Sequence, residues 1–260
     1  ELDGVDGVRP YSDITQKIDT MSARSSFRYL ILYCVCMKKS IRIWDLPTRI
    51  FHWLFAFTII GSIVTIQLGE QQLHAYCGYT ALILIFFRII WGLIGPFHIR
   101  FVNFIPTWSK LRAYFQGKSF GGLGHNPLGA LSVIALIFIP LIQGLTGLFI
   151  DDDIAFTGPL SKFISNDLVS TLSSIHRINS NLIYGVIGLH VVAILYYLIF
   201  KRKNLIKPMI DGDQLLSEEH SEKKSLEPLP QSSKDDWQVR VLALFIVLSL
   251  SVIFWYFVLS

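Results

Sequence analysis

Five apolar segments, each about as long as a membrane-spanning helix, dominate this 260-residue chain. Four of them are residues 50–68, 75–97, 128–150 and 239–260, and one more carries His176 and His190 and runs to Phe200. A run of about 20 apolar residues is what a helix needs to cross a bilayer. Mean hydropathy is +0.49 and only 16% of the residues are charged. The sequence therefore predicts an all-α integral membrane protein.

Positive charge alternates between the connecting segments. Lys and Arg concentrate before the first span, between the second and third, and after the fourth. The opposite loops hold only Lys162 and Arg177, beside an excess of acidic residues. The positive-inside rule places the N-terminus in the cytoplasm. The net charge of +4 then reflects loops that face lipid headgroups, and no nucleic-acid partner is expected.

Four histidines near the spans pair by depth. His176 and His190 are fourteen residues apart, which returns a helical side chain to nearly the same face about 21 Å further along. With the predicted orientation, His74 lies level with His176 near the outer surface. His52 lies level with His190 near the inner surface. Two matched pairs at two depths are expected from two metal centres stacked in one bundle.

Haem is the cofactor that such pairs fit. Imidazole is a common iron ligand, and two imidazoles from facing helices can clamp a haem. A single histidine in a span is also compatible with an interhelical hydrogen bond. The three cysteines form no C-x-x-C-H motif, which excludes covalent c-type attachment, and the three methionines lie outside the spans. The sequence therefore predicts two b-type haems with bis-histidine ligation.

Several motifs resemble the bacterial cytochrome b561 family, which shares its fold with the cytochrome b subunit of nickel–iron hydrogenases. They are WDLPTRIFHW (44–53), HAYCGYTALILIFFRIIWGLIG (74–95), GHNPLG (124–129), TGLF (146–149), GPL (158–160) and the IH…GLH spacing of the fourth span. The resemblance covers about residues 41–212. It implies a four-helix haem-binding bundle, with His52, His74, His176 and His190 as the axial ligands. The fifth C-terminal span departs from this pattern.

Four further residues are candidates for cofactor binding. Gly78 follows His74 by one turn, where a missing Cβ lets a flat macrocycle approach, although ordinary helix packing explains it equally. Arg88 lies at the depth of the inner pair and suits a haem propionate or a quinone oxygen. Its alternative is snorkelling toward the headgroups. Arg49 and Arg177 are further propionate candidates for the inner and outer haem.

The organisation expected along the chain has four parts. Residues 1–40 form a poorly ordered extension, 41–212 the cytochrome b561-like domain, 213–237 a cytoplasmic linker and 238–260 the fifth span. A polar composition with Pro and Ser favours the linker assignment.

These observations predict a membrane-bound di-haem cytochrome that transfers electrons between the quinone pool and a partner. The partner is either a periplasmic cytochrome c, steered by the acidic cluster Asp151–Asp152–Asp153, or a membrane-docked hydrogenase or dehydrogenase. If the chain is an enzyme, its reaction is quinol or quinone oxidoreduction, and no catalytic residue is assigned. The alternative is a haem-free transporter or structural membrane protein, for which Pro140 in the third span is the one hint.

Overall fold

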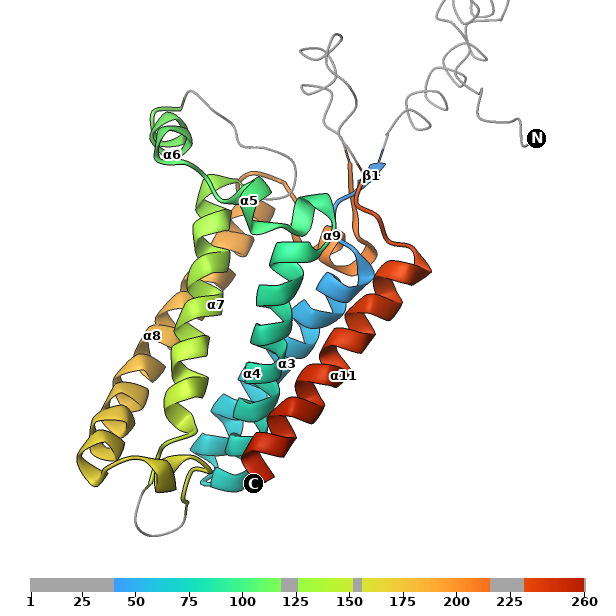
Figure 1. Ribbon diagram of the computed structural model, residues 1–260. Coiled ribbons are helices and arrows are strands. Elements are labelled where there is room, and N and C mark those ends of the chain that lie inside the picture. Colours follow the sequence, from blue (N-terminus) through green and yellow to red (C-terminus); the bar gives the residue numbers. More distant parts are fainter. Residues whose placement is uncertain (1–39, 118–125, 152–155, 216–231, 260) are drawn as a thin grey trace, which may run out of the picture. The chain divides into compact units, whose positions relative to one another are not determined.

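The computed structural model describes residues 40–117, 126–151, 156–215 and 232–259 (Figure 1). The chain divides into two compact units, and every helix described below belongs to the unit formed by Arg42–Gln214 and Leu229–Ser260. The extension predicted for residues 1–40 falls almost wholly outside the described residues, as does most of the predicted linker.

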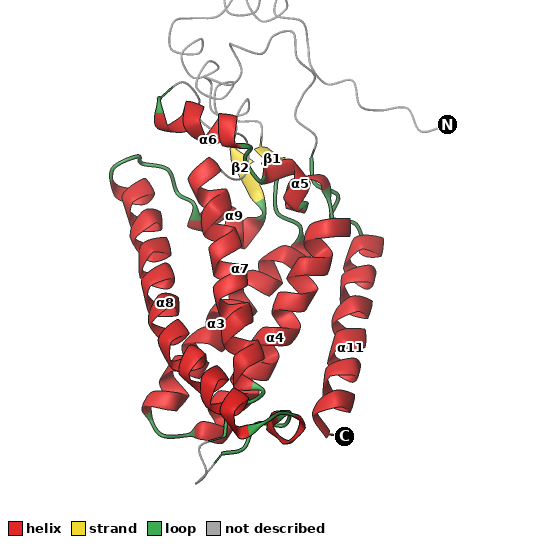
Figure 2. Cartoon of the chain, turned by 60° about the vertical axis from the view of Figure 1, so that its left-hand side comes forward, coloured by secondary structure: helices red, strands yellow, loops and turns green. Residues whose placement is uncertain are grey.

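Among the described residues, five helices are long and apolar enough to cross a membrane, which confirms the predicted all-α membrane fold (Figure 2). They are α3 (Leu46–Gln67), α4 (Gln71–Ile94), α7 (Pro127–Gly147), α8 (Asn166–Ile199) and α11 (Trp237–Leu259). Their bounds differ from the apolar runs. Helix α4 begins four residues before the predicted span, so His74 lies inside the helix and not just before it. It ends at Ile94, not Phe97, because Gly95 and Pro96 cannot continue it.

Polar caps explain why two of the spans begin where they do. The Asp45 carboxylate accepts a hydrogen bond from the Thr48 backbone N–H at 3.1 Å and thereby starts α3. The Asn126 side chain accepts one from the Gly129 N–H at 2.6 Å and starts α7. Each cap is followed by proline in the first turn, where its missing N–H has no cost. Hydropathy alone does not predict that these helices begin at a polar capping residue.

Short elements connect the spans. The short helices are α5 (Phe101–Phe104), α6 (Trp108–Phe115) and α9 (Ile206–Asp211). The 3-10 turns are η1 (Phe97–Ile99) and η2 (Ser161–Phe163), and the strands are β1 (Ser40–Arg42) and β2 (Asp213–Leu215). Strands β1 and β2 pair in a two-stranded sheet. Gly69, with φ of +79°, supplies the left-handed residue that the tight α3–α4 connection requires.

Helix α4 is the central element of the packed helices. It contacts α3, α7 and α11, while α8 packs on α7. The core cluster joins Ala75, Tyr79 and Leu82 of α4 with Leu148, and the ring centre of Phe254 in α11 lies 5.6 Å from that of Tyr79, with the rings tilted by 49°. Gly144 of α7 lies so close to Leu82 that a Cβ there would be 2.5 Å from the Leu82 Cγ. Small residues thus set the α4–α7 distance.

A cluster of ionic contacts, here called the Asp235 clamp, ties α11 to the start of α3. The Asp235 carboxylate accepts hydrogen bonds from Arg42 Nη1 at 2.7 Å, Arg240 Nε at 3.1 Å and the Leu46 backbone N–H at 3.2 Å. Its side chain is 5% exposed, and Arg49 Nη2 lies 3.7 Å from it. The fifth span is therefore fixed to the other four at one end through side chains about 190 residues apart in sequence.

Candidate functional site

The structure brings His74 and His176 together, as their predicted depths require. His74 lies in the first turns of α4 and His176 lies ten residues inside α8. Their ring centres are 6.2 Å apart and the ring planes are inclined by 81°. Both side chains are half-buried. Two imidazoles from different helices thus lie close together near one end of the bundle.

The Nδ1 atom of each of these rings is held by backbone. His74 Nδ1 lies 2.9 Å from the Ser62 carbonyl oxygen and 3.0 Å from Ser62 Oγ. His176 Nδ1 lies 2.9 Å from the Gln143 carbonyl oxygen and 3.2 Å from Thr146 Oγ1. Carbonyl oxygens only accept, so Nδ1 carries the proton in both rings. That tautomer leaves the Nε2 lone pair for a metal, which is the arrangement metal-binding histidines adopt.

A second layer of contacts supports the His176 anchor. The Thr146 hydroxyl donates to the Ile142 carbonyl at 2.8 Å, so its lone pairs face His176 Nδ1. Asn179, 5% exposed, donates to Gln143 Oε1 at 2.8 Å and links α8 to α7 beside the histidine. Gly147 completes this wall, because a Cβ there would lie 3.1 Å from His176 Cε1. Sequence reasoning missed these residues, although Thr146 and Gly147 lie in the TGLF motif.

The second pair is His52 of α3 and His190 of α8. Their pairing stays a prediction. The His52 ring meets Trp53 edge-on, with centres 5.1 Å apart. His52 Nδ1 is buried, and no group of the described residues hydrogen-bonds to it. This pair therefore lacks the anchors that the first pair possesses at His74.

The donor set fits haem better than a bare metal ion. Within the described ranges no three His, Cys, Asp or Glu side chains are grouped to hold a metal. Each histidine pair offers two nitrogens, which suffices only where a macrocycle supplies the other ligands. His74 and His176, whose ring centres are 6.2 Å apart, would be the residues that hold such a group at this end of the bundle.

Gly78 and Arg88 occupy different environments. A Cβ at Gly78 would meet nothing within 4 Å, so this face of α4 is open and no packing against another helix requires the glycine. Arg88 is only 3% exposed and donates to the Ile99 carbonyl at 3.4 Å, with its guanidinium 5.2 Å from the centre of the Phe101 ring. Snorkelling requires an exposed head group, and Arg88 does not have one.

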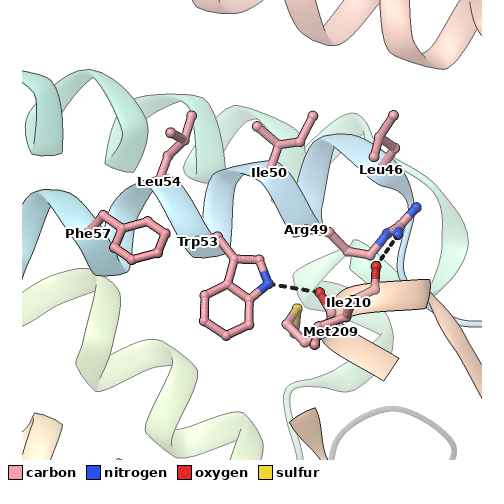
Figure 3. A pocket seen from close by; sticks show the side chains of 8 residues that line it. All are labelled: Leu46, Arg49, Ile50, Trp53, Leu54, Phe57, Met209 and Ile210. Carbon is pink, nitrogen blue, oxygen red and sulfur yellow. Dashed lines mark hydrogen bonds between the residues drawn. The ribbon is translucent and has the colours of Figure 1, made fainter. Parts of the chain in front are cut away.

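Arg49 and Arg177 contact groups other than the histidines. Arg49 Nη1 donates to the Ile210 carbonyl at 2.5 Å, beside an open groove of about 340 Å³ between α3 and α9 (Figure 3). In the same groove, Trp53 Nε1 donates to the Met209 carbonyl at 3.1 Å. Arg177 is exposed and bonds to Ser174 Oγ at 3.3 Å. Their roles toward haem propionates stay predictions.

A buried polar cluster lies at the other end of α4, next to the start of α3. Asp45 is fully buried, and its second carboxylate oxygen accepts from Trp91 Nε1 at 2.9 Å. Burial raises the pKa of Asp45 above its usual value, although hydrogen bonds from Thr48 and Trp91 act against the rise. The cluster fixes the first turn of α3, seven residues before His52.

Part of the proposed acidic cluster is also placed. Asp151 forms an isolated antiparallel bridge with Thr157, whose hydroxyl donates to the Asp151 carboxylate at 3.3 Å. Asp152 and Asp153 lie outside the described residues. The steering role predicted for the cluster stays a prediction.

Five apolar helices in the described part of the chain, with two histidines brought together between α4 and α8, are typical of the class of multi-pass membrane redox proteins. The sequence profile of the prokaryotic cytochrome b561 family matches residues 43–212, and the chain belongs to this family. It is therefore a membrane b-type cytochrome of electron transport, and haem b is the cofactor that this family implies. The match ends before α11, which is consistent with the fifth span as an addition to the shared domain.

Named relatives agree with the family match. The chain is 22% identical over 220 residues to a probable Ni/Fe-hydrogenase B-type cytochrome subunit of Rhizobium leguminosarum bv. viciae, covering 70% of this chain and 91% of the relative. It is 21% identical to the corresponding subunit of Rhodobacter capsulatus, covering 71% and 85%. A probable Ni/Fe-hydrogenase 1 B-type cytochrome subunit of Escherichia coli K12 is 23% identical, covering 40% and 57%. No solved structure is significantly similar to the chain.

Proposed function

We propose that this chain is a di-haem cytochrome b subunit that carries electrons across a bacterial inner membrane between a redox partner and the quinone pool. His74 and His176 would hold one haem b, and His52 and His190 the other. The observation that carries this proposal is the first pair: two rings 6.2 Å apart, each with Nδ1 fixed to a backbone carbonyl. With Nδ1 engaged in this way, Nε2 is the ring nitrogen that can bind a metal in both histidines.

A hydrogenase is the proposed partner. The relatives with the longest matches bear the name of Ni/Fe-hydrogenase B-type cytochrome subunits, and the match to the Rhizobium protein covers 91% of its length. The concentration of Lys and Arg in alternate loops supports an orientation in which the N-terminus is cytoplasmic and the His74–His176 pair faces the periplasm. A partner on the periplasmic side would then deliver electrons at that pair, and quinone would react toward the other.

The residues of this chain would bind the haems, orient the imidazole ligands and exclude water. Haem, when bound, supplies one-electron chemistry that no side chain here provides. Ser62 and the Gln143 carbonyl hold the two imidazoles of the outer pair in one tautomer and one orientation. The apolar faces of α3, α4, α7 and α8 keep water from the site, which limits how much the surroundings must reorganise when charge changes. Helix α8 contributes one ligand to each pair.

Haem content tests the proposal directly. A pyridine haemochrome assay on purified, haem-replete protein should approach two haems per chain. His74→Ala and His176→Ala should each remove the same haem, so that their spectra match. His52→Ala and His190→Ala should each remove the other.

The matched control is His98→Ala, in the turn η1, which should retain both haems. If His52→Ala and His74→Ala gave identical single-haem spectra, the pairing would be wrong. A protein without an α-band in its reduced-minus-oxidised spectrum would support a haem-free transporter or structural protein.

A further inference from the structure

We propose that the groove between α3 and α9 binds one anionic phospholipid, with an acyl chain along its apolar wall and the phosphate at the arginines of the Asp235 clamp. The four histidines are not among the residues that line this groove. The proposal therefore concerns a separate binding site and does not depend on haem ligation.

The first observation is the wall of the groove, which has a volume of about 340 Å³ (Figure 3). Helix α3 lines it with side chains three or four residues apart, which fall on one face of a helix. These residues are Leu46, Arg49, Ile50, Trp53, Leu54 and Phe57. Ile50, Leu54 and Phe57 are 49%, 50% and 66% exposed, and Met209 and Ile210 of α9 form the opposite wall. The groove is thus open on a lipid-facing side of α3.

The second observation is that the polar groups of this wall are already engaged. Trp53 has a single side-chain N–H, which it donates to the Met209 carbonyl at 3.1 Å. Arg49 Nη1 donates to the Ile210 carbonyl at 2.5 Å (Figure 3). The head of a quinone needs a donor for each carbonyl oxygen, whereas a hydrocarbon chain needs none. The wall therefore fits an acyl chain better than a quinone head.

The third observation is an uncompensated positive charge where the groove reaches the start of α3. Leu46 and Arg49 both line the groove and both contact Asp235, through the Leu46 N–H at 3.2 Å and Arg49 Nη2 at 3.7 Å. In the part of the chain that the structure describes, three arginines meet two carboxylates at this point. The arginines are Arg42, Arg49 and Arg240, and the carboxylates are Asp213 and Asp235. A phosphodiester carries the one negative charge that this cluster lacks.

Neighbouring charged groups do not reverse the sign of this end. Lys207 and Asp211 of α9 pair with each other at 4.0 Å. Asp45 is fully buried, and its carboxylate accepts a hydrogen bond from Trp91 of α4 at 2.9 Å, so it is shielded from a lipid headgroup. Residues 201–203, Lys-Arg-Lys, are exposed after α8 and add positive charge. Basic groups between spanning helices are what recognises anionic headgroups.

Two of the arginines are accessible to a phosphate. The side chains of Arg42 and Arg240 are 32% and 48% exposed, so each can donate to a phosphate oxygen while its contact with Asp235 persists. An acyl chain gains little by leaving bulk lipid for an apolar groove, because both are equally apolar. The selectivity of the site must therefore come from charge, at about fivefold in affinity for each basic side chain.

Native mass spectrometry of the purified, delipidated protein tests the site by counting bound lipids during a titration. The probes are palmitoyl-oleoyl phosphatidylglycerol, which carries one negative charge, and phosphatidylethanolamine with the same chains, whose amine cancels the phosphate. The parent protein should bind one phosphatidylglycerol about fivefold more tightly than phosphatidylethanolamine. Leu54→Trp, which fills the groove, should abolish this preference. The matched control is Leu244→Trp on α11, where Leu244 is 58% exposed outside the groove, and it should keep the preference.

A second pair of variants tests the headgroup contact. Arg240→Gln removes one positive charge and should lower the affinity for phosphatidylglycerol about fivefold, without changing that for phosphatidylethanolamine. Arg240→Lys keeps the charge and should keep the preference. Circular dichroism of each variant shows whether the helices are intact.

Three results would overturn the proposal. Equal affinities for the two lipids in the parent protein would mean that the charge selects nothing. An unchanged preference in Leu54→Trp would place the bound lipid elsewhere on the surface. Displacement of phosphatidylglycerol by an equimolar amount of decylubiquinone would assign the groove to quinone. Because these measurements do not report on haem, their failure would leave the proposed function standing.

Discussion

Removal of Asp235 should loosen the fifth span from the remaining helices. The carboxylate accepts hydrogen bonds from Arg42, Arg240 and the Leu46 backbone N–H, at 2.7, 3.1 and 3.2 Å. Asp235→Ala removes all three hydrogen bonds at once. It also leaves Arg42 with Asp213 as its remaining acidic partner, at 2.8 Å.

The magnitude follows from the exposure of the partners. Asp235 is 5% exposed, whereas the Arg42 and Arg240 side chains are 32% and 48% exposed. Charge-assisted hydrogen bonds contribute about 1.5–3 kcal/mol each when shielded, and exposed ion pairs contribute about 0–1 kcal/mol. Water can replace part of what the two arginines lose. We therefore expect a total loss of about 3 kcal/mol for Asp235→Ala and about half of that for Asp235→Asn, which keeps one oxygen acceptor.

Hydrogen exchange in detergent micelles measures this loss locally. An opening free energy reduced by about 3 kcal/mol accelerates exchange about 100-fold, because each 1.4 kcal/mol is a factor of ten. The acceleration should be confined to the first turns of α3 and α11. Asp167→Asn, an exposed carboxylate in the first turn of α8, is the matched control and should change exchange less than tenfold. If the exchange rates in Asp235→Ala and in the control were equal, the Asp235 clamp would not be what holds α11 to α3.

The pH dependence of the same contact has a defined sign. Burial acts to raise the pKa of Asp235, but hydrogen bonds from Arg240 and Arg42 outweigh it and hold the pKa below its usual 3.8. The folded pKa is lower than the unfolded one, so the contribution is fully present above about pH 4 and is lost as the pH falls further. The parent protein and Asp235→Ala should therefore converge in stability below pH 4. The pH dependence that Asp45 contributes to stability has the opposite sign, because burial raises the pKa of Asp45 and its protonation favours the folded state.

Two glycine substitutions on α7 should separate packing from cofactor geometry. Gly144→Ala places a Cβ 2.5 Å from the Leu82 Cγ and should lower the thermal unfolding midpoint, at a cost of about 1–3 kcal/mol. The control is Gly185→Ala on α8, where the new Cβ has nothing within 4 Å and the midpoint should not fall. Gly147→Ala places a Cβ 3.1 Å from His176 Cε1 and should alter the α-band of one haem only, as read by low-temperature visible spectroscopy; a change in both haems, or in neither, would contradict this.

Two features of the fold and site could be predicted because they depend on helix geometry alone. The five spans follow from apolar runs of the right length, and the spacing of His176 and His190 places them on one face. Depth then pairs His74 with His176, because the two lie on spans that start from the same side. The structure places these two rings 6.2 Å apart.

The remaining features depend on how helices rotate against one another, which hydropathy does not record. That the Gln143 carbonyl faces His176 follows from the α7–α8 contact, and a backbone acceptor leaves no signature in the sequence. Six of the ten residues of α8 before His176 are polar, and this stretch extends the helix beyond the predicted span. The Asp235 clamp joins residues about 190 positions apart, a distance at which no local pattern is informative.

The position of α4 has a consequence for how this protein can evolve. More than half of its apolar stretch, 56%, is buried against α3, α7 and α11, whereas at most 17% is buried in any other span. A residue that faces lipid needs only to be apolar, because acyl chains adjust to any shape. A residue between three helices must also fit. Substitutions should accumulate freely on the outer faces of α3, α8 and α11 and slowly along α4. Helix α4 should therefore retain the most sequence similarity among distant relatives.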